Sequence, residues 1–216
     1  MKRKGMLVII SGPSGAGKGT VVKKLEKDDY ALSISMTTRE KRPQEVDGKD
    51  YFFCTKEIFI ELRDNGQLLE HAEFVGNMYG TPKRYVEEQI ADGKAVILEI
   101  DVIGALQVKA KFEDSVLIFL MPPTLEELSQ RLINRKTENK ETIKRRLKRS
   151  EKDLEYIKEY NYLVINDEIS DAVSKIHTII DSEYLKPHRN LSSIENFKGD
   201  DFDVASFLLR VDEYFE

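Results

Sequence analysis

The sequence predicts an α/β fold in which a doubly wound parallel sheet carries helices on both faces. Apolar runs alternate with amphipathic helical patterns along the chain, an order typical of parallel strands joined by crossover helices. The runs at 7–10, 95–101, 116–120 and 162–165 are largely continuous, which indicates strands buried on both faces. A glycine-rich segment follows the first run, at the turn from strand to helix where such sheets place a functional loop.

The glycine-rich segment has the glycine and lysine spacing of a P-loop. Glycine lets the backbone take positive φ and curl close to a phosphate, so that backbone N–H groups point inward at the positive end of the next helix. The lysine adds an ammonium that can follow charge onto the β- and γ-phosphates. A glycine-rich turn without a ligand is the alternative, and the order of strand, loop, lysine and helix disfavours it. The candidate ATP site comprises Gly12, Pro13, Ser14, Gly15, Ala16, Gly17, Lys18, Gly19 and Thr20.

The residues after the lysine depart from the usual P-loop. Gly19 stands where Ser or Thr normally supplies a hydroxyl to Mg²⁺, and the hydroxyl follows one position later, at Thr20. We therefore expect Mg²⁺ to enter with ATP and to rest mainly on phosphate oxygens and water, which suits its reluctance to dehydrate. No protein ligand is assigned directly, and Thr20 and Glu99 are the two alternatives.

The composition excludes several classes of protein. The 216 residues suffice for one sizeable core with inserted subdomains. Charged residues make up 34% and the net charge is −5, so the chain lacks the basic footprint of a nucleic-acid-binding protein. Too few apolar residues follow Met1 for a signal peptide or a membrane span. Cys54 is the only cysteine, which excludes an intramolecular disulfide and favours the cytoplasm.

The first half of the chain predicts the start of the core and a small insertion. A helix is expected at 20–27 and a strand at 30–35. The next residues are polar and basic up to Pro43, and the change in composition indicates that 35–93 form an inserted mixed subdomain. Its expected elements are strands at 51–53, at 68–75 and around Tyr79, and a helix at 56–64 with Thr55 as its N-cap.

The second half predicts the rest of the core and a tail. The strand at 95–101 ends in Glu99 and Asp101, two carboxylates that lie two residues apart and so on one face. The residues 136–152 are dense in charge. In the acidic tail at 191–216, apolar residues recur at helical spacing, and we expect an extra helix packed on the core rather than a subunit contact. Further helices are expected at 103–112, at 124–135, and from Asn166-Asp167 to about Leu185.

A P-loop alone does not identify the class of enzyme. A GTPase needs Asp-x-x-Gly at a strand end, and the residues 101–104 fit that pattern. It also needs Asn-Lys-x-Asp to read guanine, but the Asn-Lys pair at 139–140 is followed by Glu141 and Thr142, within a charged helical pattern. A kinase that acts on a small nucleotide needs instead a second phosphate site and arginines that close over both nucleotides.

Longer motifs surround that second site. The sequence reads S-I-S-M-T-T-R at 33–39, R-P at 42–43, V-D-G-K-D-Y-F-F at 46–53, L-E-H-A-E-F at 69–74 and G-N-M-Y-G-T-P at 76–82, followed by L-E-I-D at 98–101, P-P at 122–123 and V-I-N-D at 164–167. With these motifs the chain resembles the guanylate kinases over about residues 6 to 186. The resemblance implies a P-loop core at 1–34, 94–125 and 156–190, a GMP-binding subdomain at 35–93 and a mobile helical lid at 126–155.

The resemblance also implies Mg²⁺-dependent transfer of the γ-phosphoryl group of ATP to GMP, giving ADP and GDP. Lys18 and the lid residues Arg131 and Arg146 are implied to neutralise charge on the transferring group, while Arg135 and Asn166 join the ATP site. The GMP phosphate is assigned to Arg39, Arg42, Tyr51 and Tyr79, and the guanine to Ser35, Glu70, Thr81 and Asp101. The use of dGMP, and the choice between a monomer and a homo-oligomer, stay open.

Elementary chemistry supports the phosphate assignments. A phosphate monoester carries about two negative charges on three oxygens, and paired arginine forks such as Arg39 and Arg42 match it. On spacing alone, a solvated basic loop is the alternative for the arginines, and core packing is the alternative for the two tyrosines. The sequence departs from the family at His71, where an aromatic residue is common, and at Lys136, where glycine is common.

Two rival functions share this fold. A non-catalytic interaction domain of the same fold characteristically loses the loop lysine and glycines, whereas Lys18, Gly15 and Gly17 are present. A kinase for another small phosphorylated metabolite has no need of Glu70 in a guanine-reading context. We therefore expect a cytoplasmic guanylate kinase with ATP and GMP as its partners, and neither nucleic acid nor a membrane.

Overall fold

The computed structural model describes residues 4–74, 76–134 and 139–190. Its centre is a parallel five-stranded sheet, as the sequence predicted, and the strands follow the order β2-β7-β1-β8-β9. All six residues of β1 are buried, because this strand lies between β7 and β8. The five strands are β1 (Met6–Ser11), β2 (Tyr30–Leu32), β7 (Ala95–Glu99), β8 (Val116–Met121) and β9 (Tyr162–Ile165).

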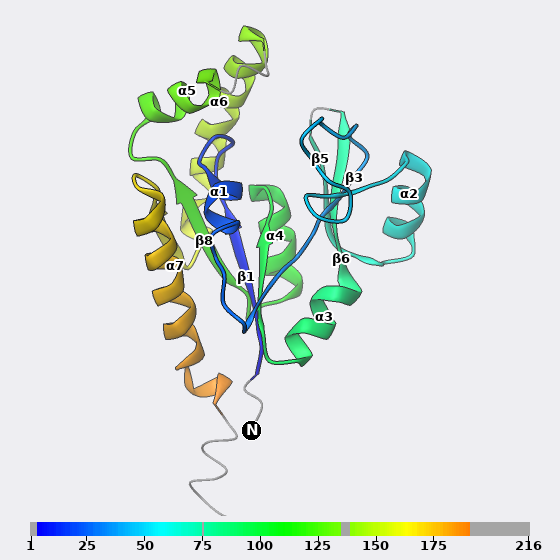
Figure 1. The fold of residues 1–216 in the computed structure, drawn as a ribbon, viewed down its shortest axis with the longest axis vertical. Helices are drawn as coiled ribbons and strands as arrows, with labels where there is room; N and C mark the ends of the chain where they lie inside the picture. The colour runs from blue at the N-terminus through cyan, green and yellow to red at the C-terminus, as the bar shows by residue number, and fades with distance from the viewer. Residues whose placement is uncertain (1–3, 75, 135–138, 191–216) are drawn as a thin grey trace, which may run out of the picture.

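Helices cover both faces of this sheet (Figure 1). Successive residues of β1 point to opposite faces, so that Val8 and Ile10 pack in one apolar cluster and Leu7 and Ile9 in another. The first cluster is completed by the helices α1 (Lys18–Val22) and α7 (Ile169–Tyr184), and the second by α3 (Lys83–Ala91) and α4 (Val102–Lys111). The fold is therefore doubly wound.

A second sheet of four strands stands beside the carboxyl end of the first (Figure 1). Its strands, in the order β4-β3-β6-β5, are β4 (Phe52–Phe53), β3 (Met36–Thr37), β6 (Asn77–Pro82) and β5 (Leu68–Phe74). The helix α2 (Lys56–Asp64) packs on β5 and begins where the Thr55 hydroxyl accepts a hydrogen bond from the Ile58 amide, which confirms the predicted N-cap. The edge strand β5 is joined to α4, because the Gln107 side chain bonds both the N–H and the C=O of His71 (3.2 and 2.8 Å).

Two further helices project from the same end of the five-stranded sheet, on the other side of the P-loop (Figure 1). They are α5 (Leu125–Asn134) and α6 (Lys140–Glu155), and the short helix η1 (Ile157–Glu159) leads from α6 back to β9. The Asn139 side chain caps α6 by accepting from the Thr142 amide. The Asn-Lys pair at 139–140 thus begins a helix, which removes it from any strand end.

Several predicted boundaries were wrong. The helix expected at 20–27 ends at Val22, because the amides of Lys24 and Leu25 turn to carbonyls three residues back and close a tighter turn. The strand expected at 30–35 ends at Leu32, and after one more bond from the Ser33 amide to the five-stranded sheet the chain crosses to the second sheet.

Two elements of the segment 35–93 were not predicted at all. The helix α3 lies within the segment 35–93 but packs on β7 and β1 of the five-stranded sheet, with Val86 fully buried there. The strand β3 has two residues and is held between β4 and β6. Arg135, Lys136 and the predicted tail helix at 191–216 lie outside the described residues.

Ion pairs connect the last described segment, around residues 187–189, to the core. The short helix η2 (Pro187–Arg189) brings the buried Arg189 guanidinium to Asp114 (3.1 Å), which precedes β8, and to Glu183 of α7 (3.7 Å). Glu183 is itself 2% exposed and accepts from the Tyr162 hydroxyl and from Lys186. No helix within the described residues is both long enough and apolar enough to cross a membrane.

Candidate active site

A cavity of about 440 Å³ opens where the P-loop, the four-stranded sheet and α6 meet. It lies beyond the carboxyl ends of β1 and β7, the usual ligand position in an open parallel sheet. Glu99, the last residue of β7, and Asp101, two positions later, both line it, as predicted for carboxylates on one face. Other predicted residues that line the cavity are Gly12, Ser14, Lys18, Ser35, Arg39, Arg42, Tyr51, Tyr79 and Arg146.

The P-loop has the backbone that its glycines predict. Gly12, Gly15 and Gly17 take φ of 137°, 97° and 89°, values that favour glycine. A Cβ on Gly12 would lie 2.1 Å from the backbone oxygen of Leu120, so β8 leaves no room for a side chain there. The Lys18 ammonium donates to the carbonyls of Gly12 (2.7 Å) and Pro13 (3.1 Å), which places it over the loop it belongs to. The loop thus combines three glycines at positive φ with a cation at the cavity wall.

Arg131 and Asn166 contact the P-loop through the carbonyl oxygen of Ala16. Arg131 of α5 donates to Asn166 O (3.0 Å) and Ala16 O (3.5 Å) and pairs with Glu127 (2.7 Å). The buried Asn166 amide also donates to Ala16 O (2.8 Å), while its Oδ1 is buried with no hydrogen-bond partner among the described residues. Neither residue lines the cavity, and both reach the P-loop at the Ala16 carbonyl.

The side chains named for the metal differ in position. Glu99 lines the cavity, and a Cβ on Gly19 would lie 3.2 Å from Glu99 Oε2, so this carboxylate rests against the first turn of α1. Thr20 is exposed and does not line the cavity. The described residues hold no cluster of three or more His, Cys, Asp and Glu side chains that could bind a metal ion. A carboxylate oxygen beside the P-loop fits the oxygen chemistry of Mg²⁺, and Glu99 is the side chain that offers it.

The two arginines assigned to the acceptor phosphate share one carboxylate. Arg39 donates to both oxygens of Glu45 (2.8 and 3.0 Å), whose Oε2 also accepts from the Arg42 amide (2.9 Å). Burial raises the pKa of Glu45, but the hydrogen bonds from Arg39 and Arg42 outweigh it and lower the pKa below its usual value. The sequence analysis missed Glu45; its spacing of three residues after Arg42 could have indicated a turn that returns a carboxylate to the arginines. The Glu45 carboxylate therefore holds both the side chain of Arg39 and the backbone of Arg42.

Two tyrosines complete that part of the cavity. The Arg39 guanidinium lies over the Tyr51 ring, 5.5 Å from its centroid, and the rings of Tyr51 and Tyr79 meet edge to face at 6.1 Å. Burial, followed by the charge of Glu99, raises the pKa of Tyr51 to about 12. Tyr51 therefore stays a neutral hydroxyl, able to donate to a phosphate oxygen at any physiological pH.

The residues assigned to the base lie deeper. Glu70 of β5 is 3% exposed, accepts from the Thr81 hydroxyl of β6 (2.7 Å) and does not line the cavity. Ala72, two positions along the same face of β5, lines it instead. A Cβ on Gly104 would lie 2.7 Å from Glu70 Oε2 and 3.3 Å from Asp101 Oδ1, so both carboxylates reach the amino end of α4. Burial, to which the charge of Asp101 adds, raises the pKa of Glu70 to about 7.

Helix α6 supplies the opposite wall. The Arg146 guanidinium donates to the Ser14 hydroxyl of the P-loop, and Arg149 donates to Asp101 Oδ2 (2.9 Å). Burial raises the pKa of Asp153, which also lines the cavity, although the charges of Arg149 and Lys18 act against that rise. Arg149 and Asp153 were not predicted as site residues. Their spacing of four on a helix places them on one face, and that periodicity was the available signal.

The arrangement can hold two anions in one chamber. One anion site is the P-loop with Lys18, and the other is the fork pair of Arg39 and Arg42 with its two tyrosines. No general base is needed to explain the layout, because phosphoryl transfer depends mainly on positioning and on stabilising charge.

Comparisons with known proteins give one consistent result. The guanylate kinase family profile matches residues 4–183. The chain is 54% identical to guanylate kinase of Oceanobacillus iheyensis over 191 residues, which cover 88% of this chain and 93% of that one. It is 47% identical to guanylate kinase of Streptococcus thermophilus over 203 residues, 93% of this chain and 97% of that one. A crystal structure of guanylate kinase from Anaplasma phagocytophilum superposes with a TM-score of 0.80 at 32% identity, covering 94% of this chain and 98% of the other.

Proposed function

The chain belongs to the guanylate kinase family, and from that premise we propose that it transfers the γ-phosphoryl group of ATP to GMP in a Mg²⁺-dependent reaction. An oxygen of the GMP phosphate forms the new bond to the γ-phosphorus, and the bond from that phosphorus to the oxygen bridging to ADP breaks. The products are ADP and GDP. The observation that carries this proposal is the pair of anion sites that face each other across a single cavity.

The donor side uses the P-loop. The inward backbone N–H groups and Lys18 hold the phosphates of ATP, with Gly19 and Thr20 at the start of α1. Asn166 and Arg131 support the loop through the Ala16 carbonyl. Mg²⁺ bound with ATP would supply charge neutralisation at the phosphate oxygens, and Glu99, whose carboxylate lies beside Gly19, would be the side chain that helps to hold it.

The acceptor side holds GMP by its two ends. The planar guanidinium forks of Arg39 and Arg42 match the charge of the phosphate and the spacing of its oxygen pairs, and Tyr51 and Tyr79 add neutral donors. The guanine edge carries two adjacent donors, N1–H and N2–H₂, and a carboxylate accepts both at once. Glu70 is assigned this role, with Ser35, Thr81 and Asp101 around the base. Because Glu70 does not line the cavity in this structure, the acceptor must approach β5 more closely than the present cavity wall allows.

The proposed reaction requires the phosphate-binding residues to converge on the two nucleotides. The phosphate-binding residues come from three separate stretches, so we propose that the segments 35–93 and 126–155 move toward the core when both nucleotides bind. In the closed form Arg131, Arg135 and Arg146 neutralise the transferring group, and water is excluded so that ATP is not hydrolysed. The free thiol of Cys54 suits the reducing cytoplasm that we propose as the location.

A coupled assay of ADP release with GMP, dGMP, AMP, CMP and IMP tests the proposal. We expect GMP to be strongly preferred to AMP, with IMP, which lacks the 2-amino group, between them. Glu70→Ala should cut kcat/KM for GMP far more than for AMP. A wild-type protein that prefers AMP or CMP, or that releases ADP at the same rate without an acceptor, would contradict the assignment.

A further inference from the structure

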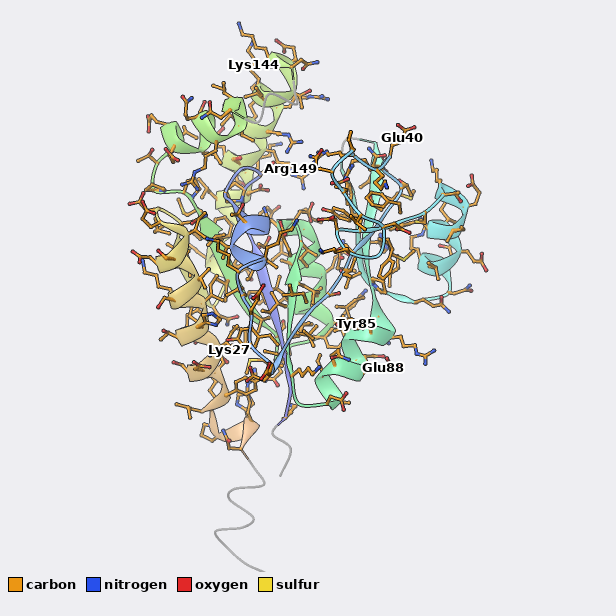
Figure 2. The ribbon with its side chains drawn as sticks, viewed as in Figure 1. Lys27, Glu40, Tyr85, Glu88, Lys144 and Arg149 are labelled. Carbon is orange, nitrogen blue, oxygen red and sulfur yellow. The ribbon has the colours of Figure 1, made fainter. Side chains whose placement is uncertain are left out.

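An ion pair connects the lid to the base end of the acceptor site. Arg149 of α6 donates through Nη2 to Asp101 Oδ2 at 2.9 Å, and both side chains line the cavity. Figure 2 labels Arg149 on the part of α6 that is turned toward the four-stranded sheet. Its neighbour one turn earlier, Arg146, reaches the P-loop instead, through the Ser14 hydroxyl. The two arginines therefore contact opposite ends of the cavity from one helix.

Asp101 has both of its oxygens committed. Oδ1 accepts from the Gly104 amide (2.8 Å) and caps α4, while Oδ2 accepts from Arg149. The same glycine brings the Glu70 carboxylate alongside, as the 2.7 Å and 3.3 Å approaches of a Cβ on Gly104 to Glu70 Oε2 and Asp101 Oδ1 demonstrate. Two carboxylates that meet at one helix end repel each other, and Arg149 offsets this repulsion at Asp101.

An exposed ion pair is usually weak, and the Arg149 and Asp101 side chains are 34% and 32% exposed. Two features set this pair apart. It is a charge-assisted hydrogen bond to one oxygen of a site carboxylate whose other oxygen caps α4, and it joins residues that are 48 positions apart in the chain. A contact of this kind fixes the direction of Oδ2 as well as adding attraction.

We infer that Arg149 is a positioning residue for the acceptor base, acting through Asp101: it holds the Asp101 carboxylate in the orientation that the base meets and ties the lid helix to the acceptor site. This inference rests on the proposed function, because it assumes that Asp101 faces the base of GMP. Arg149 thereby serves the acceptor nucleotide, whereas Arg146, on the same helix, serves the donor.

Steady-state kinetics of Arg149→Met test the inference, since Met keeps the bulk of the side chain and removes its hydrogen bond and charge. We expect KM for GMP to rise about tenfold, the range of one charge-assisted hydrogen bond, with kcat and KM for ATP within threefold of wild type. Arg149→Lys should recover part of the loss, because an ammonium can still pair with Asp101. Lys152→Met, an exposed cation on the same helix, is the matched control for the loss of one charge and should leave KM for GMP unchanged.

A double-variant cycle separates a role through Asp101 from any other. In the Asp101→Asn background, Arg149→Met should raise KM for GMP by less than twofold further. An equal rise in both backgrounds, an unchanged KM for GMP in the single variant, or a main effect on kcat or on KM for ATP would each overturn the inference. Wild-type protein that fails to phosphorylate GMP would instead refute the proposed function, so the two failures are distinguishable.

Discussion

Glu70→Gln should raise the unfolding free energy of the free protein and weaken its binding of GMP. Glu70 is 3% exposed, and burial with the nearby charge of Asp101 raises its pKa from 4.5 to about 7, despite the hydrogen bond from Thr81. A pKa that is higher in the folded state means that the folded protein binds a proton more tightly than the unfolded chain. The free energy of unfolding therefore falls as the pH rises from about 4.5 to about 7 and stays lower above that range.

The size of the effect follows from the two pKa values. A rise from 4.5 to about 7 corresponds to roughly 3 kcal/mol of unfolding free energy lost at pH 8, relative to pH 4. Gln keeps an acceptor for the Thr81 hydroxyl and carries no charge, so the variant should be up to about 3 kcal/mol more stable than wild type at pH 8 and about equal at pH 4. Urea unfolding at the two pH values measures this difference.

The affinity of the wild-type protein for GMP should rise with pH, whereas its stability falls. With a pKa of about 7, roughly nine-tenths of Glu70 is ionised at pH 8 and one-tenth at pH 6, so the affinity for GMP should fall about tenfold between those values if the carboxylate form binds. The phosphate of GMP titrates near pH 6 and adds its own dependence in every variant. Glu70→Gln should therefore bind GMP weakly and retain only that smaller dependence, as calorimetric titration would reveal. Wild-type unfolding free energy that does not fall between pH 4 and pH 8, or a variant with the wild-type pH dependence of binding, would refute the reasoning.

Four further predictions address the loop, the core and the closure. Lys18→Met should lower kcat by about 10²–10³-fold with little change in Tm; activity within threefold of wild type would contradict the donor site. Gly12→Ala should cost about 1–3 kcal/mol of stability and most of the activity, because its Cβ would meet the Leu120 oxygen at 2.1 Å; a folded, active variant would count against the loop geometry. Arg189→Met should cost about 1–3 kcal/mol in urea unfolding, since it removes a partner of the buried Glu183, with kcat unchanged; a normal unfolding curve would contradict this. A bisubstrate analogue should reduce the radius of gyration in small-angle scattering, and no change would argue against closure.

The core of the fold could be predicted because its signals are local. The continuous apolar runs of β1 and β8 can bury their side chains only if other elements cover both faces of the strand. The glycines at 12, 15 and 17 adopt positive φ values, which few other residues tolerate. The position of α3 could not be predicted in the same way. Its partner surface is β7 and β1, and the reason that it packs there lies in the tertiary arrangement rather than in its own sequence.

In the candidate site too, residues within sequence motifs could be predicted better than features that depend on tertiary contacts. Residues carried by motifs, such as Lys18 and Arg39, line the cavity. Glu45 was missed although its contacts with Arg39 and Arg42 lie within one short segment. Arg149 was missed because its contact, Asp101, lies 48 positions away in the chain. Glu70 was predicted, but its depth was not, since burial depends on how β5 sits against α4.

The central position of β1 has a consequence for the making of the protein. This strand is translated before either neighbour, yet Val8 pairs with Ile97 of β7 and with Val116 of β8, about 90 and 110 residues later. At roughly 5–20 residues per second, an apolar strand remains unpaired for about 5–20 s while the ribosome adds its partners. Such long-range pairing also slows folding, because the chain must close large loops before the strand gains any bond. A strand whose six residues are all buried in the folded protein is therefore left without its partners for a long time in the nascent chain, which makes it a natural target for chaperones that bind extended apolar peptides.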